Sequence, residues 1–379
     1  MKLTKPNLNK RLTLKEIEAS LLYTHDYPEN VVEDLMPKIS EINRIRDEKN
    51  AVILAHYYQV PAIQLIADIK GDSLKLAQEA QKLGDDNGLI VSSTVRFMAE
   101  MVKLFNPEKK VVVPSYDAGC SIAEGMNGIS VRRIREEFPE SAIVAYINTY
   151  ADVKAEVDSV CTSANAKDIL RNIKGNPVIL LPDYFFSTNV VNELLKESAD
   201  PRKFLAYKRR DLSRLVLEDV KSKEEYRIHV DEYATLPLLD KGTCIVHEQF
   251  TPEEIRYLRK KDGIELVIAH PEVNPNILKE VDFVGGTGNM ISFVKDSKAK
   301  KYLVITECDL TAPLRETFPD KEFYTPCKLC PYMKKNSIDN LLSSLRDEVY
   351  EINLDPNTFH GARRSLDNMF ALTNGGLII

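Results

Sequence analysis

The order of apolar and polar segments repeats three times along this chain of 379 residues, and this repeat constrains the fold more than any other feature. Each copy has three short apolar runs typical of buried strands, a helical stretch and a cysteine near its end. The first runs are VILAHYYQ, IVAYINTYAD and LVIAHPE, and the second runs are LIVSSTVRF, DSVCTSANA and DFVGGTGNM. The third runs are KVVVPS, PVILLPD and YLVITE. Because strands that alternate with helices form parallel layers, we expect three related α/β domains.

Changes in sequence texture predict the boundaries of these domains. Before the first copy, Leu35, Ile39, Ile42 and Ile45 recur at intervals of three and four, which is typical of a helix with one buried face. Within the second copy a charged stretch interrupts the repeat, and the alternation in EYRIHVDEY favours an exposed strand, so we interpret it as an elaboration with a structural role. The expected parts are a helical extension at 1–45, units at 46–140, 141–262 (elaborated at 187–240) and 263–350, and a C-terminal segment at 351–379.

Composition excludes several classes of protein. The formal net charge is -6, so no basic excess exists to neutralise a nucleic-acid backbone. Six cysteines in 379 residues are too few for a secreted domain stapled by disulfides, and the N-terminal stretch MKLTKPNLNKRLTLKEIE lacks the apolar core of a secretory signal. The chain has no apolar run long enough to span a membrane. We therefore expect a cytoplasmic protein without a nucleic-acid or membrane partner.

Polar side chains follow the first strand of each copy. They are His56, Tyr58, Tyr146, Asn148, His270 and Glu272. In parallel α/β folds, active sites form at the carboxyl ends of strands. The Ser/Thr/Gly turns that precede the helices suit anion binding, because helix N-termini present free N–H groups. A simple helix cap is the alternative interpretation of each such turn.

One cysteine closes each copy: Cys120, Cys244 and Cys330. Three thiolates can hold a 4Fe–4S cluster and leave its fourth iron open as a Lewis acid. The pair Cys327 and Cys330 also permits a zinc site or a thioredoxin-like redox pair, although no second CxxC exists and Pro331 follows directly. We interpret Cys161 and Cys308 as small buried hydrophobes.

Taken together, these motifs resemble the quinolinate synthase family from about residue 45 to the end. The motifs are AHYYQ, IKGDSLKLA, VRFMAE, AGCS, YINTYADVKAEVDSVCTSANA, LPD, GTCIVHEQFTPEEI, HPE, TGNM and CPYMK. The resemblance implies an α/β fold of three pseudo-equivalent three-layer αβα domains with short parallel sheets around one central site. It also implies that iminoaspartate condenses with dihydroxyacetone phosphate to give quinolinate, phosphate and water in NAD biosynthesis. An aspartate oxidase or dehydrogenase would supply the unstable imine.

The resemblance further implies roles for individual residues. Cys120, Cys244 and Cys330 match the ligands of one 4Fe–4S cluster with an open iron, and Cys327 is then an extra thiol for which a redox role is a hypothesis. The positions that match substrate contacts are His56, Ser73, Tyr146, Asn148, Ser163, His270, Glu272 and Thr287. Tyr58 and His247 lie near the same site by motif, and Glu272 is the expected general acid/base, with Tyr58, Tyr146 and His247 as further catalytic candidates. Gly286 stands where relatives often have serine.

Two other functions remain open from the residues. One is an iron–sulfur sensor or carrier with a fully coordinated cluster. The other is a zinc-dependent lyase or binding module that uses Cys327, Cys330 and a histidine. An intact cluster without substrate binding would favour the sensor. Metal analysis of anaerobically purified protein identifies the zinc alternative, which predicts about one zinc without sulfide against four irons with sulfide.

Overall fold

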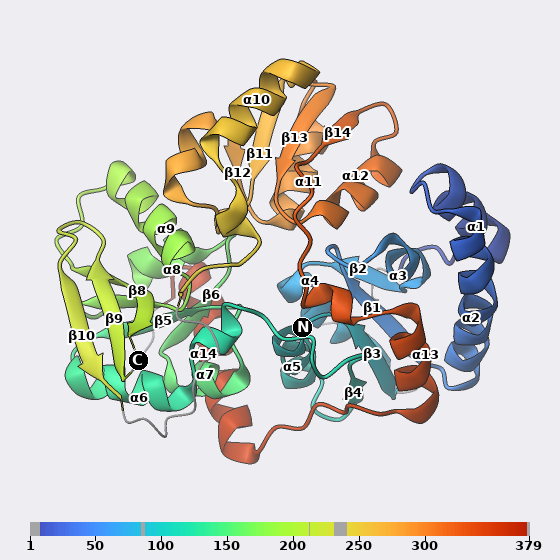
Figure 1. Ribbon diagram of the computed structural model, residues 1–379. Helices are drawn as coiled ribbons and strands as arrows, with labels where there is room; N and C mark the ends of the chain where they lie inside the picture. Colours follow the sequence, from blue (N-terminus) through green and yellow to red (C-terminus); the bar gives the residue numbers. More distant parts are fainter. Residues whose placement is uncertain (1–7, 85–87, 212, 231–240, 377–379) are drawn as a thin grey trace. The chain divides into compact units, whose positions relative to one another are not determined.

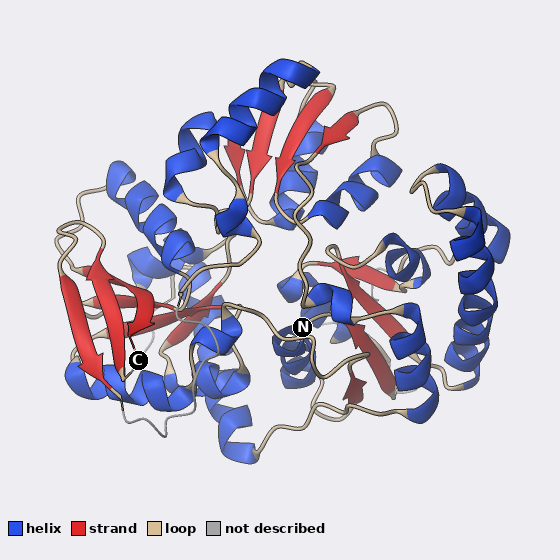
Figure 2. Ribbon diagram, in the orientation of Figure 1, coloured by secondary structure: helices blue, strands red, loops and turns tan. Residues whose placement is uncertain are grey.

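The computed structural model describes residues 8–84, 88–211, 213–230 and 241–376 as alternating helices and strands (Figures 1 and 2). Its α-helices are α1 (Leu14–Tyr23), α2 (Glu29–Glu48), α3 (Pro61–Ile66), α4 (Ser73–Ala80), α5 (Arg96–Phe105), α6 (Gly128–Glu137), α7 (Ala151–Glu156), α8 (Ala166–Asn172), α9 (Tyr184–Glu197), α10 (Pro252–Asp262), α11 (Thr287–Asp296), α12 (Thr311–Thr317), α13 (Ile338–Asp347) and α14 (Pro356–Thr373). Its strands are β1 (Val52–His56), β2 (Ile69–Gly71), β3 (Leu89–Ser93), β4 (Lys110–Val112), β5 (Ala142–Tyr146), β6 (Ser159–Cys161), β7 (Val178–Leu181), β8 (Phe204–Asp211), β9 (Arg214–Asp219), β10 (Glu225–His229), β11 (Leu266–Ala269), β12 (Phe283–Val284), β13 (Lys301–Ile305) and β14 (Glu322–Tyr324). Short 3₁₀ helices are η1 (Ala123–Gly125), η2 (His247–Gln249), η3 (Pro275–Glu280), η4 (Cys308–Leu310) and η5 (Met333–Lys335).

The strands form three sheets, and one strand order recurs in all of them (Figure 2). The orders are β2-β1-β3-β4, β6-β5-β7-β8 and β12-β11-β13-β14. The first two sets pair in parallel throughout, and so do the outer pairs β11–β12 and β13–β14. The predicted α/β class with short parallel sheets is confirmed, and the structure is consistent with a three-layer αβα arrangement.

The strand order corrects the way in which we aligned the first copy of the repeat. LIVSS forms β3, which takes the place of β7 and β13 in its sheet, so it corresponds to the runs PVILLPD and YLVITE. The true counterpart of β6 and β12 is β2, which has only three residues and includes the polar Lys70. Because Lys70 stands at the centre of β2, no apolar run marks this strand in the sequence.

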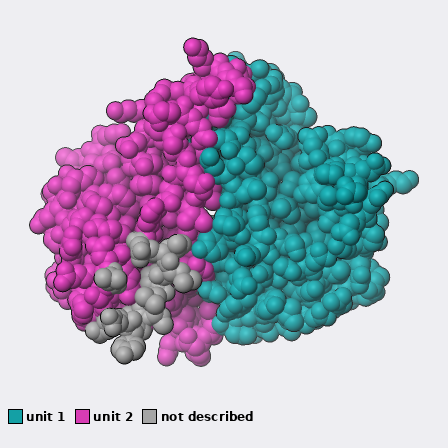
Figure 3. All heavy atoms as spheres, in the orientation of Figure 1, with its two compact units in different colours: residues 1–119, 263–266, 291–353 teal, residues 120–262, 267–290, 354–379 magenta. Residues whose placement is uncertain are grey.

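By contacts, the chain divides into two compact units, which are coloured separately in Figure 3. Unit 1 comprises residues 1–119, 263–266 and 291–353, and unit 2 comprises 120–262, 267–290 and 354–379. The division passes through the third sheet and through α11, and we describe each unit by itself. The three-domain boundaries expected from the sequence stay a prediction.

In unit 1, the first sheet has helices packed against its strands. β1 and β3 are buried along their whole length, as expected for a parallel sheet covered on both faces. Alternate residues such as Ile53 and Ala55 join one apolar cluster with α1, α2 and α13. Helix α2 buries Ile39, Ile42 and Ile45, which confirms the helical spacing predicted for this stretch. Helices α4 and α5 pack against each other and against the strands β1 and β3.

In unit 2, the last helix returns to complete the second sheet. Helix α14 packs against α7, α8 and β6 (Figure 1). Gly361 permits this close approach, because a Cβ atom at that position would lie 2.8 Å from the Cβ of Ala155. Side-chain amides then join the surfaces: Asn368 donates to the carbonyl of Asp158 over 2.8 Å, and Asn172 donates to that of Leu372 over 2.7 Å.

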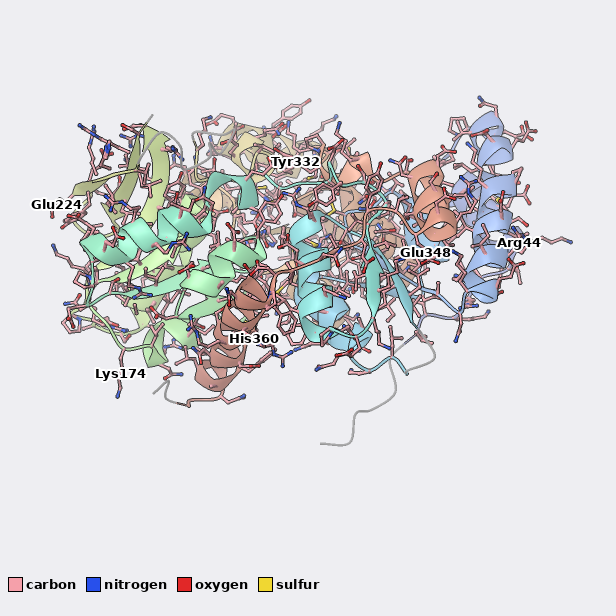
Figure 4. The ribbon with its side chains drawn as sticks, turned by 90° about the horizontal axis from the view of Figure 1, so that it is seen from below. Arg44, Lys174, Glu224, Tyr332, Glu348 and His360 are labelled. Carbon is pink, nitrogen blue, oxygen red and sulfur yellow. A yellow bond between two sulfur atoms is a disulfide. The ribbon has the colours of Figure 1, made fainter. Side chains whose placement is uncertain are left out.

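Two antiparallel strands, β9 and β10, extend the second sheet beyond β8. The exposed strand expected in the elaboration is β10, which has a buried Ile228 between exposed Arg227 and His229. Glu224 lies just before β10 in the turn that follows β9, at the rim of the molecule in Figure 4. Ion pairs connect the side chains of these antiparallel strands; for example, Lys208 in β8 lies 2.6 Å from Glu218 in β9. No helix in the described part of the chain is long and apolar enough to cross a membrane.

Candidate active site

Glu272 lies at the centre of the polar groups that unit 2 gathers at its strand ends. It follows β11 in a turn closed by the Val273 N–H, which donates to the His270 carbonyl over 3.2 Å. Its carboxylate is buried, with 3% of the residue exposed. Nδ2 of Asn148 donates to Oε1 over 3.1 Å, and Oε2 lies 2.9 Å from Nδ1 of His247. Three residues predicted from separate motifs therefore meet at one carboxylate.

Two stacked imidazole rings flank this carboxylate. The rings of His247 and His270 lie 4.8 Å apart at an interplanar angle of 20°, and Nδ1 of His270 is 3.7 Å from Glu272. Burial alone would raise the pKa of Glu272, but His270, His247 and the Tyr146 hydroxyl together lower it to about 2. Burial lowers the pKa of His270 to about 4, against the opposing effect of Glu272. At neutral pH the site thus holds an ionised carboxylate beside a neutral His270.

The turn after β5 is fixed by a buried lysine. Nζ of Lys154 donates to the carbonyl of Ile147 over 3.0 Å and also contacts the carbonyl and hydroxyl oxygens of Thr149. The lysine is fully buried, so these acceptors replace its hydration. Tyr146 is the last residue of β5, and its ring stacks on the ring of Phe186 with the ring centres 4.0 Å apart. Both contacts hold Tyr146 and Asn148 towards the Glu272 carboxylate.

A second clamp holds the backbone on both sides of Glu272. The side-chain amide of Asn189, in α9, donates to the carbonyls of Pro271 and Val273, each over 2.9 Å. Asn189 is buried, with 4% exposed, and lies more than 80 residues from its partners in the sequence. Because one amide grips both neighbours of Glu272, the position of the carboxylate depends on α9.

Asp183 is a further buried carboxyl group near this centre. It follows β7 and caps α9, since its Oδ1 accepts the N–H of Phe186 over 2.8 Å. Burial raises the pKa of Asp183 well above its usual range, and repulsion from Glu272 raises it further. Of the two acids, Glu272 has imidazole and amide partners, so the proton belongs on Asp183.

Ser163 follows β6, and Thr287 follows its counterpart β12; each residue lies between a strand and the next helix or at the start of that helix. Thr287 is the first residue of α11, and Ser163 precedes α8. A Cβ atom added to Gly286 would lie 2.3 Å from Oγ of Ser163. The glycine therefore leaves room for the Ser163 hydroxyl beside the start of α11. Ser163 therefore lies against Gly286, the residue directly before Thr287.

Unit 1 gathers the remaining predicted residues around the end of β1. Oη of Tyr58 lies 2.6 Å from Oγ1 of Thr306, and the N–H of Tyr58 donates to Nδ1 of His56 over 3.1 Å. Ser73 is buried and begins α4, with Asp72 as the N-cap. Its place after β2 matches that of Thr287 after β12.

The three predicted ligand cysteines occupy loops of the same local structure. Each cysteine carbonyl accepts the N–H four residues later, over 2.9 to 3.1 Å, and a 3₁₀ helix follows three residues after the cysteine. Seven residues after each cysteine a polar side chain caps the next α-helix; these caps are Asn127, Thr251 and Ser337. Tyr332 marks the third loop in Figure 4. This recurrence strongly supports the repeat read from sequence.

Charged groups hold the Cys330 loop within unit 1. The N–H of Cys330 donates to Oε1 of Glu307 over 3.2 Å, and Nζ of Lys334 lies 2.8 Å from the same oxygen. Lys334 also donates to the carbonyl of Tyr58 over 2.6 Å. Burial raises the pKa of the Cys330 thiol to about 11, so a thiolate there needs a nearby cation. The Tyr58 loop and the Cys330 loop are thus tied together.

The structure corrects our interpretation of Cys308 as a simple buried hydrophobe. Cys308 forms a disulfide with Cys327, whereas Cys120, Cys161, Cys244 and Cys330 stand outside any disulfide. A thiol bonded in this way is not available for zinc, which weakens the alternative that paired Cys327 with Cys330. A pocket of about 420 Å³ opens beside the disulfide, and its lining includes none of the predicted site residues.

Sequence reasoning missed the residues that position the site. No motif pointed to chemistry at Lys154, Asp183 or Asn189. Two of these residues stand in segments that were noted, Lys154 in VKAE and Asp183 in LPD. Their contacts join elements far apart in sequence, which periodicity cannot reveal. In the sequence Lys154 stands between Asp152 and Glu156, so nothing distinguished it from a solvated lysine.

Comparison with known proteins identifies the family of this chain. Residues 40–371 match the family model described as Quinolinate synthetase A protein. The chain belongs to the quinolinate synthase family. Quinolinate synthase from Sinorhizobium fredii is 37% identical over 338 residues, which cover 89% of this chain and 82% of that protein. Quinolinate synthase from Alkaliphilus metalliredigens is 37% identical over 336 residues, covering 88% and 98%, and that from Caldicellulosiruptor saccharolyticus is 35% identical over 335 residues, covering 88% and 97%.

The cysteine loops fit the cluster that the quinolinate synthase resemblance implies. Three thiol donors stand in matching loops outside the disulfide, and two of them, Cys120 and Cys244, belong to unit 2. Three thiolates are the donor set of a 4Fe–4S cluster with one open iron. The half-buried Cys330, whose thiolate needs a cation, fits the same role.

Proposed function

We propose that the chain catalyses the quinolinate synthase reaction, in which iminoaspartate and dihydroxyacetone phosphate give quinolinate, phosphate and water. The observation that carries this proposal is the buried Glu272 carboxylate with Asn148 and His247 on its two oxygens, within a chain of this family. The reaction joins two carbon chains, closes an imine and removes water twice, so it needs groups that move protons in a site shielded from solvent.

Glu272 acts as the general acid/base. Its carboxylate is ionised at neutral pH, because its pKa is lowered to about 2 once the imidazoles offset its burial. A substrate that displaces the Asn148 amide or the imidazole contact would raise that pKa and let the carboxylate accept a proton. His247, at 2.9 Å, is the neighbour able to pass the proton on.

Hydroxyl, amide and imidazole groups bind the substrate oxygens. Ser163 and Thr287 offer hydroxyls at the start of α11, and Ser73 does so at the start of α4. Asn148 and His270 flank Glu272, and His56 stands at the end of β1. Tyr58 and Tyr146 supply phenol donors. Such neutral donors suit carboxylate and phosphate oxygens without adding a fixed positive charge.

Cys120, Cys244 and Cys330 would hold one 4Fe–4S cluster. When bound, this cluster supplies a Lewis acid at its open iron. The chain's part is to present three thiolates from three matching loops and to fix the third loop through Glu307 and Lys334. We further propose a cytoplasmic enzyme whose imine substrate comes from an aspartate oxidase or dehydrogenase, because the imine hydrolyses in water.

Anaerobic reconstitution with iron and sulfide, followed by an assay for pyridine dicarboxylate from both precursors, tests this function. Product formation together with about four irons per chain supports it. An intact cluster without binding of either precursor would favour an iron–sulfur sensor instead. Product formed by a chain that holds about one zinc and no sulfide would favour a zinc enzyme.

A further inference from the structure

Cys244, His247 and Glu272 form a compact set of metal-binding groups. One ligand atom from each lies within 4.8 Å of the other two, and all three residues belong to unit 2. His247 and Glu272 are buried, and Cys244 is half-buried. We propose that in the protein without its iron–sulfur cluster these three side chains bind one divalent transition-metal cation of the zinc class.

The spacing of the ligand atoms suits such a cation. Ligand atoms around a tetrahedral zinc, with bonds of about 2.0–2.3 Å, lie about 3.3–3.8 Å apart. Nδ1 of His247 is 2.9 Å from Oε2 of Glu272, and the three ligand atoms span at most 4.8 Å. Shifts of about 1 Å therefore convert the present arrangement into a metal site.

Charge balance favours a divalent cation at this place. A thiolate and a carboxylate contribute two negative charges, and a neutral imidazole adds none, so the loaded site is neutral overall. Sulfur, nitrogen and oxygen donors in one set are typical of zinc and cobalt sites with an open fourth position.

The proposed site shares only Cys244 with the predicted cluster. The cluster set contains Cys120 and Cys330, and the metal set contains His247 and Glu272. The two sets therefore respond to different substitutions. The proposed metal site can be tested without the proposed function, because the test measures metal binding by the chain without its cluster.

Cobalt titration of the full chain tests the proposal. The chain is purified without iron and sulfide, freed of metal with a chelator and titrated with Co²⁺ under argon. We expect one Co²⁺ per chain, with a thiolate-to-cobalt charge-transfer band, and displacement by Zn²⁺ in the same stoichiometry. Absence of one-to-one binding in the unaltered chain would overturn the proposal.

Variants then identify the ligands. Cys244→Ser should abolish the charge-transfer band, and His247→Gln and Glu272→Gln should each weaken binding at least about tenfold. Cys120→Ser, Cys330→Ser and the double variant Cys308→Ser/Cys327→Ser should bind Co²⁺ as the unaltered chain does. Loss of binding in any of these three controls would show a different thiol set and overturn the assignment.

X-ray absorption of the zinc-loaded chain gives a readout that needs no substitution. The proposal requires one sulfur and about three nitrogen or oxygen neighbours around the zinc. Two or more sulfur neighbours would contradict it. If Cys244 is also a cluster ligand, as the proposed function requires, bound zinc should slow the incorporation of iron. Unslowed iron incorporation would count against the shared use of Cys244 in the cluster and would not change the cobalt result.

Discussion

The amide of Asn148 donates to the carboxylate of Glu272 over 3.1 Å, although the two residues are 124 positions apart in the chain. Asn148 follows β5 and Glu272 follows β11, so the contact joins the strand ends of two copies of the repeat. A neutral donor on one oxygen and an imidazole on the other leave the carboxylate ionised but able to exchange partners.

Replacing Glu272 by glutamine should slow turnover while the protein keeps its iron. The amide has the same size but accepts no proton, so we expect a fall in kcat of about 10²–10⁴-fold. Steady-state kinetics and iron analysis of the reconstituted protein measure both effects. The exposed Glu137, changed to glutamine, is the matched control. Full activity in Glu272→Gln would remove this residue from the proton-transfer role.

Asn189→Ala should displace Glu272 without touching the substrate. Two buried carbonyls lose their donor, which costs about 1–3 kcal/mol of stability. Because the catalytic carboxylate is then loosely held, kcat should fall more than KM rises. Asn192, exposed on the same helix, provides the control Asn192→Ala. A loss of stability with unchanged kcat and KM would leave Asn189 a purely structural residue.

The buried Asp183 makes stability depend on pH. Its pKa is raised in the folded chain, so the native state holds a proton that the unfolded state releases, and stability falls as pH rises above about 4. The loss ends once pH passes the raised pKa. Asp183→Asn keeps the helix cap and stays neutral, so its stability should not show this slope, which reaches about 1.4 kcal/mol per pH unit. Urea unfolding at several pH values compares the two, and equal slopes would contradict the assignment.

Cysteine variants should separate the cluster ligand from the disulfide partner. Cys330→Ser should lose iron and sulfide, whereas Cys327→Ser should retain both. The second variant opens a disulfide that spans 19 residues, so it should cost about 3 kcal/mol of stability while its iron content stays normal. Iron analysis and thermal unfolding report the two effects. The reverse pattern of iron loss would exchange the roles of the two residues.

A side chain at position 286 should disturb substrate binding through Ser163. In Gly286→Ser the new Cβ meets the Ser163 hydroxyl at 2.3 Å, and the hydroxyl must rotate away. We expect KM to rise severalfold, by the loss of about one hydrogen bond, with the fold retained. Gly88→Ser is the control, since a Cβ there meets nothing within 4 Å. An unchanged KM would exclude Ser163 from binding.

The sequence predicted those parts of the fold that depend on local patterns. Apolar runs located β1, β5 and β7, and three-and-four spacing located the buried face of α2. The short β2 escaped notice, and the first copy was aligned one strand too late as a result. Local patterns carry no information on strand order, which tertiary pairing decides.

The same limit applies to the candidate site. Asn148 and Glu272 were found because parallel strands bring their carboxyl ends to one edge, whereas His247 was found only through its family motif. The clamps Lys154 and Asn189 escaped, since their partners are backbone carbonyls that no motif marks. The bond between Cys308 and Cys327 also escaped, because pairing of thiols depends on distance in the folded chain.

Helix α14 belongs to unit 2 but is synthesised after every other element of it. A nascent chain on the ribosome therefore presents β6, α7 and α8 with their outer surface uncovered until residues 356–373 emerge. The order of translation thus delays completion of this unit until α14 has emerged, and a chaperone that shields the exposed apolar surface would act during that interval.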